Sequence, residues 1–435
     1  MGPSPTEPLS GEHAIVSGPA PGTTGYPATA EHEIIVKGYR GVFAIPGTRR
    51  LLISALIGRL PIGASSLAIL LLVREQTGSF GVAGLAVGVF AIAGAIAAPF
   101  QGALLDRFGP RRVLIPLACS QATALIALVS VVAIDVGTVG ILAVAGVAGA
   151  LVPPISATVR VLWPRIIPTT QGVETAYALD ATTQELIWTS GPLLVALMIG
   201  LASPSAALLL VVGVLLAGTA LFITAPAIDS WPEDGPRRTR GGALASRPLR
   251  LLLVTAALIG MGLGSLEVGL PALSVSVHSA SMAGVLLAAW SIGSLLGGIL
   301  YGARSWTSPV AVRYAALLFA GCLAIVPLLF AGSLGVAIGL AVIAGLPGAA
   351  MLSGQYVLVG RAAPPGALAE AFTWSLSGLI TGIAAGSALA GQLVDANGAE
   401  KAFLLGAVAT GLAGLLALRP ALRARTEPAE PSVQS

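Results

Sequence analysis

The chain has 435 residues, a formal net charge of +4 and a mean hydropathy of +0.91, and it is 55% hydrophobic and only 10% charged. Soluble domains carry roughly 25% charged residues, so this composition excludes an ordinary soluble enzyme. The basic residues are dispersed in short clusters between apolar segments, a pattern that does not indicate nucleic-acid binding. The composition therefore predicts a protein that lies in a lipid bilayer.

Residues 1–46 are the first region in chain order. They are rich in Pro, Gly, Thr and Ser and poor in large apolar side chains, so they cannot bury enough surface to offset the entropy of ordering. The segment also lacks the basic start and the apolar run of a cleavable signal peptide. We therefore expect a disordered cytoplasmic tail.

Twelve apolar segments follow, each long enough to cross about 30 Å of hydrocarbon at about 1.5 Å per residue. Several contain Pro, which neighbouring helices make tolerable inside a membrane. The expected spans are 51–73, 80–101, 113–134, 138–162, 174–199, 205–225, 249–275, 280–303, 310–331, 333–359, 370–394 and 402–418. The sequence predicts an all-α polytopic membrane protein with twelve transmembrane helices.

The charged residues between the spans set the expected orientation. Apart from Arg59 inside span 1, nearly all Lys and Arg residues precede span 1 or follow an even-numbered span. The opposite side holds only Arg74 and Lys401. Because positively charged loops stay in the cytoplasm, we expect both termini to be cytoplasmic and the protein to lie in the cell membrane.

The chain divides into two halves of six spans, separated by a charged connection rich in Pro and Gly. A short motif recurs in both halves: Arg165-Ile-Ile-Pro before Glu174 returns as Arg361-Ala-Ala-Pro before Glu370. The repeat indicates a duplicated six-helix unit, with the copies related by an axis along the membrane normal. The expected regions are a first bundle at 47–225, a cytoplasmic connection at 226–248, a second bundle at 249–418 and a cytoplasmic tail at 419–435.

The loop after span 2 holds the most specific motif. It reads Gly-Ala-Leu-Leu-Asp-Arg-Phe-Gly-Pro-Arg-Arg from Gly102 to Arg112. The glycines permit close helix approach, Asp106 can accept backbone N–H bonds at a helix N-terminus, and the arginines can bridge neighbouring helix ends. The stretch closely resembles the signature loop of the major facilitator superfamily, although Pro110 replaces one of the usual basic residues.

The resemblance extends over residues 47–418 and implies the fold of that superfamily, two pseudo-symmetric six-helix bundles that alternate access between the two sides of the membrane. In the family this loop acts as a conformational latch; otherwise it is merely a basic turn that sets topology. The corresponding stretch of the second half, Gly302-Ala-Arg304, is followed by no acid, so the latch is expected on one side only. The residues at the latch positions are Gly102, Asp106, Arg107, Gly109, Arg111 and Arg112.

Two further sets of charges are candidates for the same latch. Arg165 and Glu174 lie at the cytoplasmic ends of spans 4 and 5, and Arg361 and Glu370 lie at those of spans 10 and 11. They can pair across the two bundles when that side is closed, or they are solvated charges at the membrane interface. The sequence leaves both interpretations open.

Charged residues inside the spans cost about 2.5 to 3.5 kcal/mol each on insertion scales and are therefore candidate functional residues. Arg59 in span 1 lies at a depth from which it can reach Asp180 or Glu185 of span 5, if these spans are neighbours as they are in the family. Gln184 shares a helix face with Asp180. A buried ion pair is either structural or part of a substrate site, and the sequence does not decide between them.

Glu267 in span 7 has no basic residue at comparable depth in its own half. A lone carboxyl in an apolar cavity can exchange a proton near neutral pH, so Glu267 is the predicted coupling site of a proton-coupled carrier. The alternative is a carboxyl hydrogen-bonded to Ser or backbone near the periplasmic end. Trp290 and Trp374 also fall within spans and are expected to line an apolar cavity.

No ATP-binding motif is present, because neither lysine follows the required glycines, and no cluster of His lies inside the spans. We therefore expect no cofactor, no metal, no nucleic-acid partner and no enzymatic activity. The leading hypothesis is a monomeric secondary transporter in the lipid bilayer, which couples proton flow to export of a small apolar or amphipathic substrate. The alternatives are an importer or facilitator of a small anionic metabolite, with Arg59 binding the anionic group, and a non-transporting scaffold or sensor.

Overall fold

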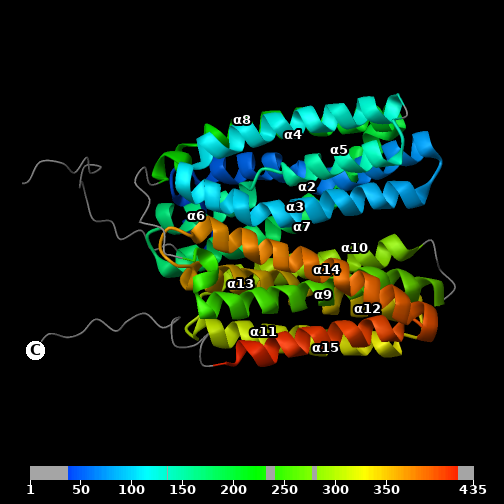
Figure 1. The fold of residues 1–435 in the computed structure, drawn as a ribbon. Coiled ribbons are helices and arrows are strands. Elements are labelled where there is room, and N and C mark those ends of the chain that lie inside the picture. The colour runs from blue at the N-terminus through cyan, green and yellow to red at the C-terminus, as the bar shows by residue number, and fades with distance from the viewer. Residues whose placement is uncertain (1–37, 135, 232–240, 277–281, 420–435) are drawn as a thin grey trace, which may run out of the picture. The chain divides into compact units, whose positions relative to one another are not determined.

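The computed structural model describes residues 38–134, 136–231, 241–276 and 282–419. Within these ranges the regular structure is helical, without strands, and twelve helices are long and apolar enough to cross a membrane. The predicted all-α fold with twelve spans is therefore confirmed. Figure 1 follows the chain from the blue helices of the first bundle to the red helix at the end of the second.

Each bundle contributes six spans. Those of the first bundle are α2 (Thr48–Thr77), α3 (Phe80–Phe108), α4 (Pro110–Ala133), α5 (Thr138–Ala150) with α6 (Ile155–Ile166), α7 (Thr170–Leu201) and α8 (Pro204–Ile223). Those of the second are α9 (Arg247–Ser276), α10 (Ala283–Ala303), α11 (Val310–Ile325) with the 3₁₀ turn η4 (Val326–Phe330), α12 (Leu334–Gly345) with α13 (Gly348–Ala362), α14 (Leu368–Asn397) and α15 (Glu400–Ala417).

The fourth and tenth spans are each interrupted near the middle. Pro153 and Pro154 separate α5 from α6, and Pro347 lies between α12 and α13. Proline has no backbone N–H and its ring clashes with the preceding turn, so a helix breaks there unless its neighbours compensate. Breaks in corresponding spans of both bundles are consistent with a duplicated unit.

The structure corrects the expectation for the segment before span 1. The last part of the predicted disordered tail forms a short helix, α1 (Gly38–Ala44), while residues 1–37 lie outside the described part of the chain. Val42 is fully buried, and α1 packs against α7 and α10. Averaging the composition over 46 residues concealed this short run of apolar side chains. The connection between the bundles likewise contains two 3₁₀ turns, η1 (Pro226–Ser230) and η2 (Ala243–Ala245).

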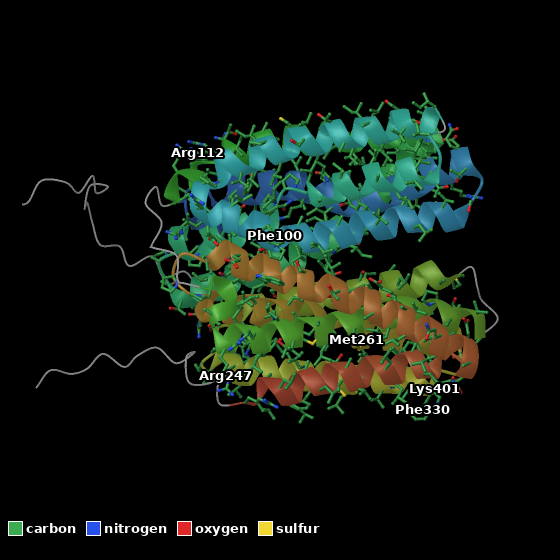
Figure 2. All side chains as sticks on the ribbon, in the orientation of Figure 1. Phe100, Arg112, Arg247, Met261, Phe330 and Lys401 are labelled. Carbon is green, nitrogen blue, oxygen red and sulfur yellow. The ribbon has the colours of Figure 1, made fainter. Side chains whose placement is uncertain are left out.

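The arginines of the connections gather at one end of the bundles, which we call the basic end. Figure 2 shows Arg112 and Arg247 at this end and Lys401 near the opposite end, called here the far end. Large apolar side chains remain on the outside, and Phe330 is 81% exposed, as a surrounding lipid phase allows.

The hydrophobic core is shared between the bundles only in part. One cluster joins both bundles toward the basic end and includes Leu105 and Trp163 of the first bundle with Tyr314 and Phe372 of the second. Two other clusters, each within one bundle, fill the halves nearer the far end. The packing of the described residues therefore ties the bundles together at the basic end.

Candidate substrate site and latch

Two arginines and one aspartate form a buried cluster in the first bundle. Arg59 Nη1 lies 2.7 Å from Asp180 Oδ1, and Arg160 Nε lies 2.8 Å from Asp180 Oδ2. All three side chains are at most 2% exposed. Because two guanidinium groups share one carboxylate, the cluster carries one uncompensated positive charge.

Several N–H groups of this cluster are unpaired. Nε and Nη2 of Arg59 and Nη2 of Arg160 are buried and hydrogen-bond to none of the described residues. Gln184 adds only a long contact, with its Oε1 3.5 Å from Arg59 Nη1. Leaving buried donors without acceptors is costly, so these atoms mark a place where a ligand or water oxygen would be stabilising.

Arg160 also faces the second bundle. Its guanidinium carbon lies 3.7 Å from the centre of the Tyr356 ring, a cation–π contact between residues at matching positions of the two repeats. A small cavity between the bundles is lined by Arg160, Tyr356 and Gln355, among others. The space that the centre of a water molecule can occupy in it has a volume of about 10 Å³. In this state the cavity has room for about one water molecule.

The second bundle presents neutral polar groups on its side of this cavity. Gln355 Nε2 donates to the Leu252 carbonyl at 2.8 Å and to Ser375 Oγ at 3.3 Å. The Tyr314 hydroxyl contacts Gln355 Oε1 and lies 3.0 Å from Thr255 Oγ1. The charge at this cavity is thus contributed by the first bundle, through Arg160.

Arg160 is the residue of this cluster that the sequence analysis missed. Predicted span 4 ends at residue 162, which places Arg160 at the membrane surface. The helix α6 instead continues to Ile166, so Arg160 lies about 9 Å inside the helix end. The repeat offered no clearer signal, because the matching residue, Tyr356, lies only three residues before the end of predicted span 10.

Glu185 lies near mid-depth and contacts the opposite bundle. Ser294 Oγ donates to Glu185 Oε1 at 2.7 Å and accepts the Ala349 backbone N–H at 3.0 Å. The sequence left Arg59 a choice between two acids, and the structure pairs it with Asp180. Glu185 is therefore free to link α7 of the first bundle to α10 of the second.

Glu267 is exposed on α9 and makes no hydrogen bond or ion pair with described residues. It lies eleven residues, three helical turns, from Ala256, which lines the cavity between the bundles. The two side chains share one helix face, so Glu267 faces the space between the bundles, closer to the far end. Trp290 and Trp374 are partly buried and pack against hydrophobic clusters of the second bundle and of the shared core.

The motif after span 2 caps a helix of the other bundle. Asp106 Oδ1 accepts the backbone N–H of Ala369 and Oδ2 accepts that of Glu370, both at 2.9 Å. These N–H groups belong to the first turn of α14, whose own capping residue, Ala367, has no side-chain acceptor. Gly102 lies one turn earlier, where an added Cβ would overlap the Ala369 carbonyl. The negative charge also matches the positive end of the helix dipole.

The remaining residues of the motif shape the turn, contact the connection that follows the first bundle, or are exposed. Gly109 has a φ of 76° and separates α3 from α4. Arg111 Nη2 donates to Asp229 Oδ1 at 2.8 Å, an exposed pair. Arg107 and Arg112 are exposed. The contact between the bundles in this motif therefore rests on Gly102 and Asp106.

Glu174 binds two arginines of the second bundle. Its Oε2 lies 2.6 Å from Arg313 Nη2, and its Oε1 lies 3.0 Å from Arg361 Nη2. The pairing of Glu174 with Arg361 across the bundles is one of the two alternatives that the sequence left open. Arg313 was missed because it lies in the first turn of a predicted span, at residues 310–331. Arg165 is exposed and forms no described ion pair, whereas Glu370 is buried and its N–H donates to Asp106.

A tyrosine from α1 occupies the place that corresponds to this motif in the second half. The Tyr39 hydroxyl donates to the Gly298 carbonyl of α10 at 3.0 Å, and a Cβ at Gly302 would overlap that hydroxyl. Burial raises the pKa of Tyr39 to about 12. The phenol therefore remains a hydrogen-bond donor at physiological pH.

Comparison with known proteins identifies the family. The family model of the Major Facilitator Superfamily matches residues 51–325, more than half of the chain. The chain belongs to the Major Facilitator Superfamily. An uncharacterized MFS-type transporter of Sinorhizobium fredii is 25% identical over 271 residues, which cover 60% of this chain and 66%, just under two thirds, of that relative.

Solved structures of Major Facilitator Superfamily transporters share the fold. The human organic anion transporter MFSD10 has a TM-score of 0.66 at 18% identity, covering 86% of this chain and 99% of that one. A bacterial homologue of the iron transporter ferroportin has a TM-score of 0.70 at 16% identity, covering 85% and 98%. The E. coli fucose:proton symporter has a TM-score of 0.65 at 15% identity, covering 89% and 100%.

The described part of this superfamily member contains no group of three His, Cys, Asp or Glu side chains that could hold a metal ion. Its candidate site instead consists of guanidinium, carboxylate and neutral polar groups at the interface of two bundles. This donor set suits an organic or inorganic ligand that accepts hydrogen bonds and carries negative charge.

Proposed function

We propose that this chain is a proton-coupled carrier that exports a small amphipathic compound bearing an anionic group. The observation that carries the proposal is the buried cluster of Arg59, Asp180 and Arg160, with its surplus positive charge and three unpaired N–H groups. A carboxylate or phosphate-type group would accept hydrogen bonds from these atoms and balance their charge. A purely apolar substrate would neither accept these hydrogen bonds nor balance the charge. An anionic group on the substrate is therefore favoured over an uncharged compound.

The arrangement of the bundles supports a direction for this transport. The excess of arginines supports a cytoplasmic position for the basic end, by the positive-inside rule. The shared core, Asp106 and Glu174 then hold a state closed to the cytoplasm. Opening this end would separate Arg160 from Tyr356 and expose the cluster to the cytoplasmic side, where an anion would bind.

Two carboxyl groups are candidates for proton coupling. Glu267 faces the space between the bundles nearer the far end, where a proton from outside would reach it first. Glu185 is the alternative, because its bond to Ser294 crosses between the bundles and would respond to their separation. Solved neighbours with this fold include an organic anion transporter and two sugar:proton symporters, so both parts of the proposal have precedent within the fold.

The test is transport in proteoliposomes with an internal pH dye and a panel of organic anions, neutral drugs and lipophilic cations. Arg160→Gln is the informative variant, because Asp180 keeps Arg59 as its partner and no buried carboxylate is left unpaired. Arg250→Gln, an exposed arginine at the basic end, is the matched control. We expect the wild type to move protons with one or more anions and Arg160→Gln to raise the KM for that anion at least tenfold, while Arg250→Gln stays unchanged.

The coupling site is tested in the same vesicles with Glu267→Gln and Glu185→Gln, with the exposed Glu75→Gln as control. Loss of proton movement with retained exchange of labelled anion identifies the coupling carboxyl. Proton movement that follows only cations or neutral drugs, and that Arg160→Gln leaves intact, would overturn the anionic substrate. Anion uptake that requires an inward proton gradient would overturn export.

A further inference from the structure

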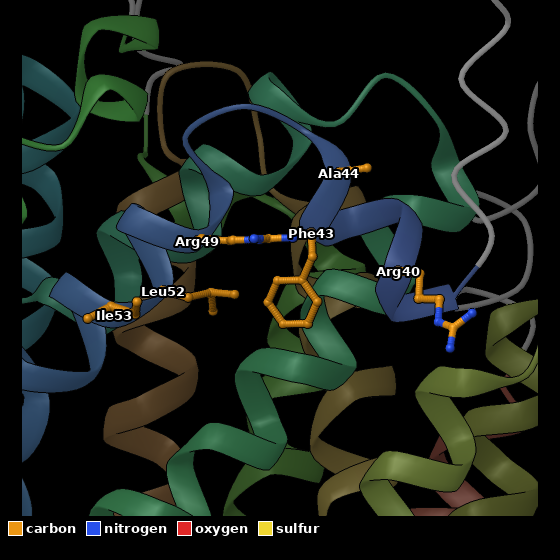
Figure 3. A pocket seen from close by; sticks show the side chains of 6 residues that line it. All are labelled: Arg40, Phe43, Ala44, Arg49, Leu52 and Ile53. Atoms are coloured by element: carbon orange, nitrogen blue, oxygen red, sulfur yellow. The ribbon is translucent and has the colours of Figure 1, made fainter.

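A second pocket lies outside the candidate substrate site, between α1 and the start of α2. It has a volume of about 530 Å³, within the range of small-ligand sites, and it is open to the surroundings. Its lining residues are Arg40, Phe43, Ala44, Arg49, Leu52 and Ile53. In the view of Figure 3, the Phe43 ring lies between Arg40 on one side and Leu52 and Ile53 on the other, with Arg49 reaching toward Phe43.

The two cations of this pocket have no partner among the described residues. Arg40 and Arg49 are both exposed, and neither makes a hydrogen bond or ion pair with a described residue. By contrast, the neighbouring Arg50 donates to Thr224 Oγ1 at 3.3 Å, and Arg111 is paired with Asp229. An anion that entered the pocket would therefore compete with no acidic side chain of the described chain.

The pocket lies where a transmembrane helix enters the bilayer. Thr48 is the first residue of α2, so Arg49 belongs to the first helical turn, at the depth of lipid headgroups. Ile53, one turn deeper, is 61% exposed on a helix that spans the membrane. The pocket thus offers positive charge at headgroup depth and apolar surface directly below it.

We propose that this pocket binds one anionic phospholipid. Its phosphate and charged headgroup would be held by Arg40 and Arg49, and the start of one acyl chain would cover Phe43, Leu52 and Ile53. Arginine suits this ligand because its guanidinium donates paired hydrogen bonds to phosphate oxygens. The cytoplasmic leaflet, in which the positive-inside rule places this end, is also the one enriched in anionic lipids.

The site has a consequence for α1. Arg40 follows Tyr39 directly, and Tyr39 binds Gly298 of the second bundle. A lipid bound between α1 and α2 would hold α1 in place against α2. Lipid binding and the contact of α1 with the second bundle should therefore strengthen each other.

The experiment uses the full-length protein in detergent, with retained lipid measured by native mass spectrometry during titration with phosphatidylglycerol or phosphatidylcholine. Arg40→Gln/Arg49→Gln is the test variant, and Arg247→Gln/Arg250→Gln, two exposed arginines at the same end of the other bundle, is the control. We expect the wild type to retain one phosphatidylglycerol with about tenfold preference over phosphatidylcholine. The test variant should lose the preference and the control should keep it.

Three results would overturn the proposal. The first is equal retention of the two lipids by the wild type. The second is an equal loss of preference in both double variants, which would indicate a general surface charge effect. The third is displacement of the bound phosphatidylglycerol by inorganic phosphate at millimolar concentration, which would indicate a site for small anions rather than for a lipid. Because binding is measured without transport, these results do not depend on the proposed export activity.

Discussion

Two pairs of helices cross between the bundles at the basic end, α3 with α14 and α10 with α7. The repeat relates the two crossings, but their contacts differ. The end of α3 contacts the start of α14, and Asp106 supplies the acceptors for the first N–H groups of α14. The corresponding end of α10 contacts α7 through Gly298 and Gly302, with no acid present. Between α10 and the first bundle lies Tyr39, from a helix outside the repeat.

The capping of the contacted helix explains this difference. α7 follows Thr169, whose hydroxyl accepts the Gly172 N–H at 3.1 Å, so this helix caps itself. α14 follows Ala367, which has no acceptor, so its first turn depends on Asp106 of the other bundle. The crossing of α3 and α14 is thus stabilised by the Asp106 carboxylate at a helix N-terminus. The crossing of α10 and α7 is stabilised by close packing and by the Tyr39 hydroxyl.

The largest expected effect comes from alanine substitution at the glycine of each crossing. Gly102→Ala should force the basic end open, because its Cβ would overlap backbone atoms of Ala369 and Glu370. Gly302→Ala should have a smaller effect, because its Cβ would overlap only side-chain atoms, those of Tyr39 and the Ala178 Cβ, and no backbone of α7. Spin labels at the exposed positions Ile115 and Val312, in a variant without native cysteines, report the separation of the basic ends.

We expect Gly102→Ala to shift most molecules to the longer distance and Gly302→Ala to shift a minority. Equal distance distributions for both variants would show that the two crossings stabilise the closed state equally, and would contradict the proposed difference between them.

A smaller effect is expected from Asp106→Asn. The amide keeps one acceptor but loses the charge and the second acceptor, and a hydrogen bond to a charged group contributes about 1.5 to 3 kcal/mol. The closed state should therefore lose about a factor of ten or more in population against the open state. The same pair of labels measures the change. The control is Asp229→Asn, which alters an exposed pair between the first bundle and the connection. An unchanged distance distribution would remove Asp106 from the latch.

The smallest effect is expected from Tyr39→Phe. The ring stays in its site and only the hydrogen bond to the Gly298 carbonyl is lost, at about 1 kcal/mol, or a factor of about five in population. The raised pKa of the phenol means that this bond is present at neutral pH and is lost only as the pH rises through about 12. A distance distribution that responds to Tyr39→Phe as strongly as to Asp106→Asn would contradict the proposed ranking.

The sequence predicted the twelve membrane helices well, because apolar segments of this length satisfy their backbone hydrogen bonds in a bilayer by forming helices. It also predicted that Asp106 could bind a helix N-terminus, because the motif specifies that geometry. It missed Arg160 and Arg313, since both lie near the ends of predicted spans, where an error of a few residues moves a side chain from the surface into the core. Tyr39 was missed because its partner lies in the opposite bundle, and no local pattern reveals such a contact.

The position of Tyr39 in the chain also bears on biosynthesis. Its acceptor, Gly298, lies 259 residues later, in the eighth span. Tyr39 therefore leaves the ribosome long before its partner exists, and its contact with α10 can form only after the second bundle has begun to insert. The finished contact would thus report that the second bundle has formed at least as far as α10, and truncated chains that end before Gly298 should leave α1 more open to added protease.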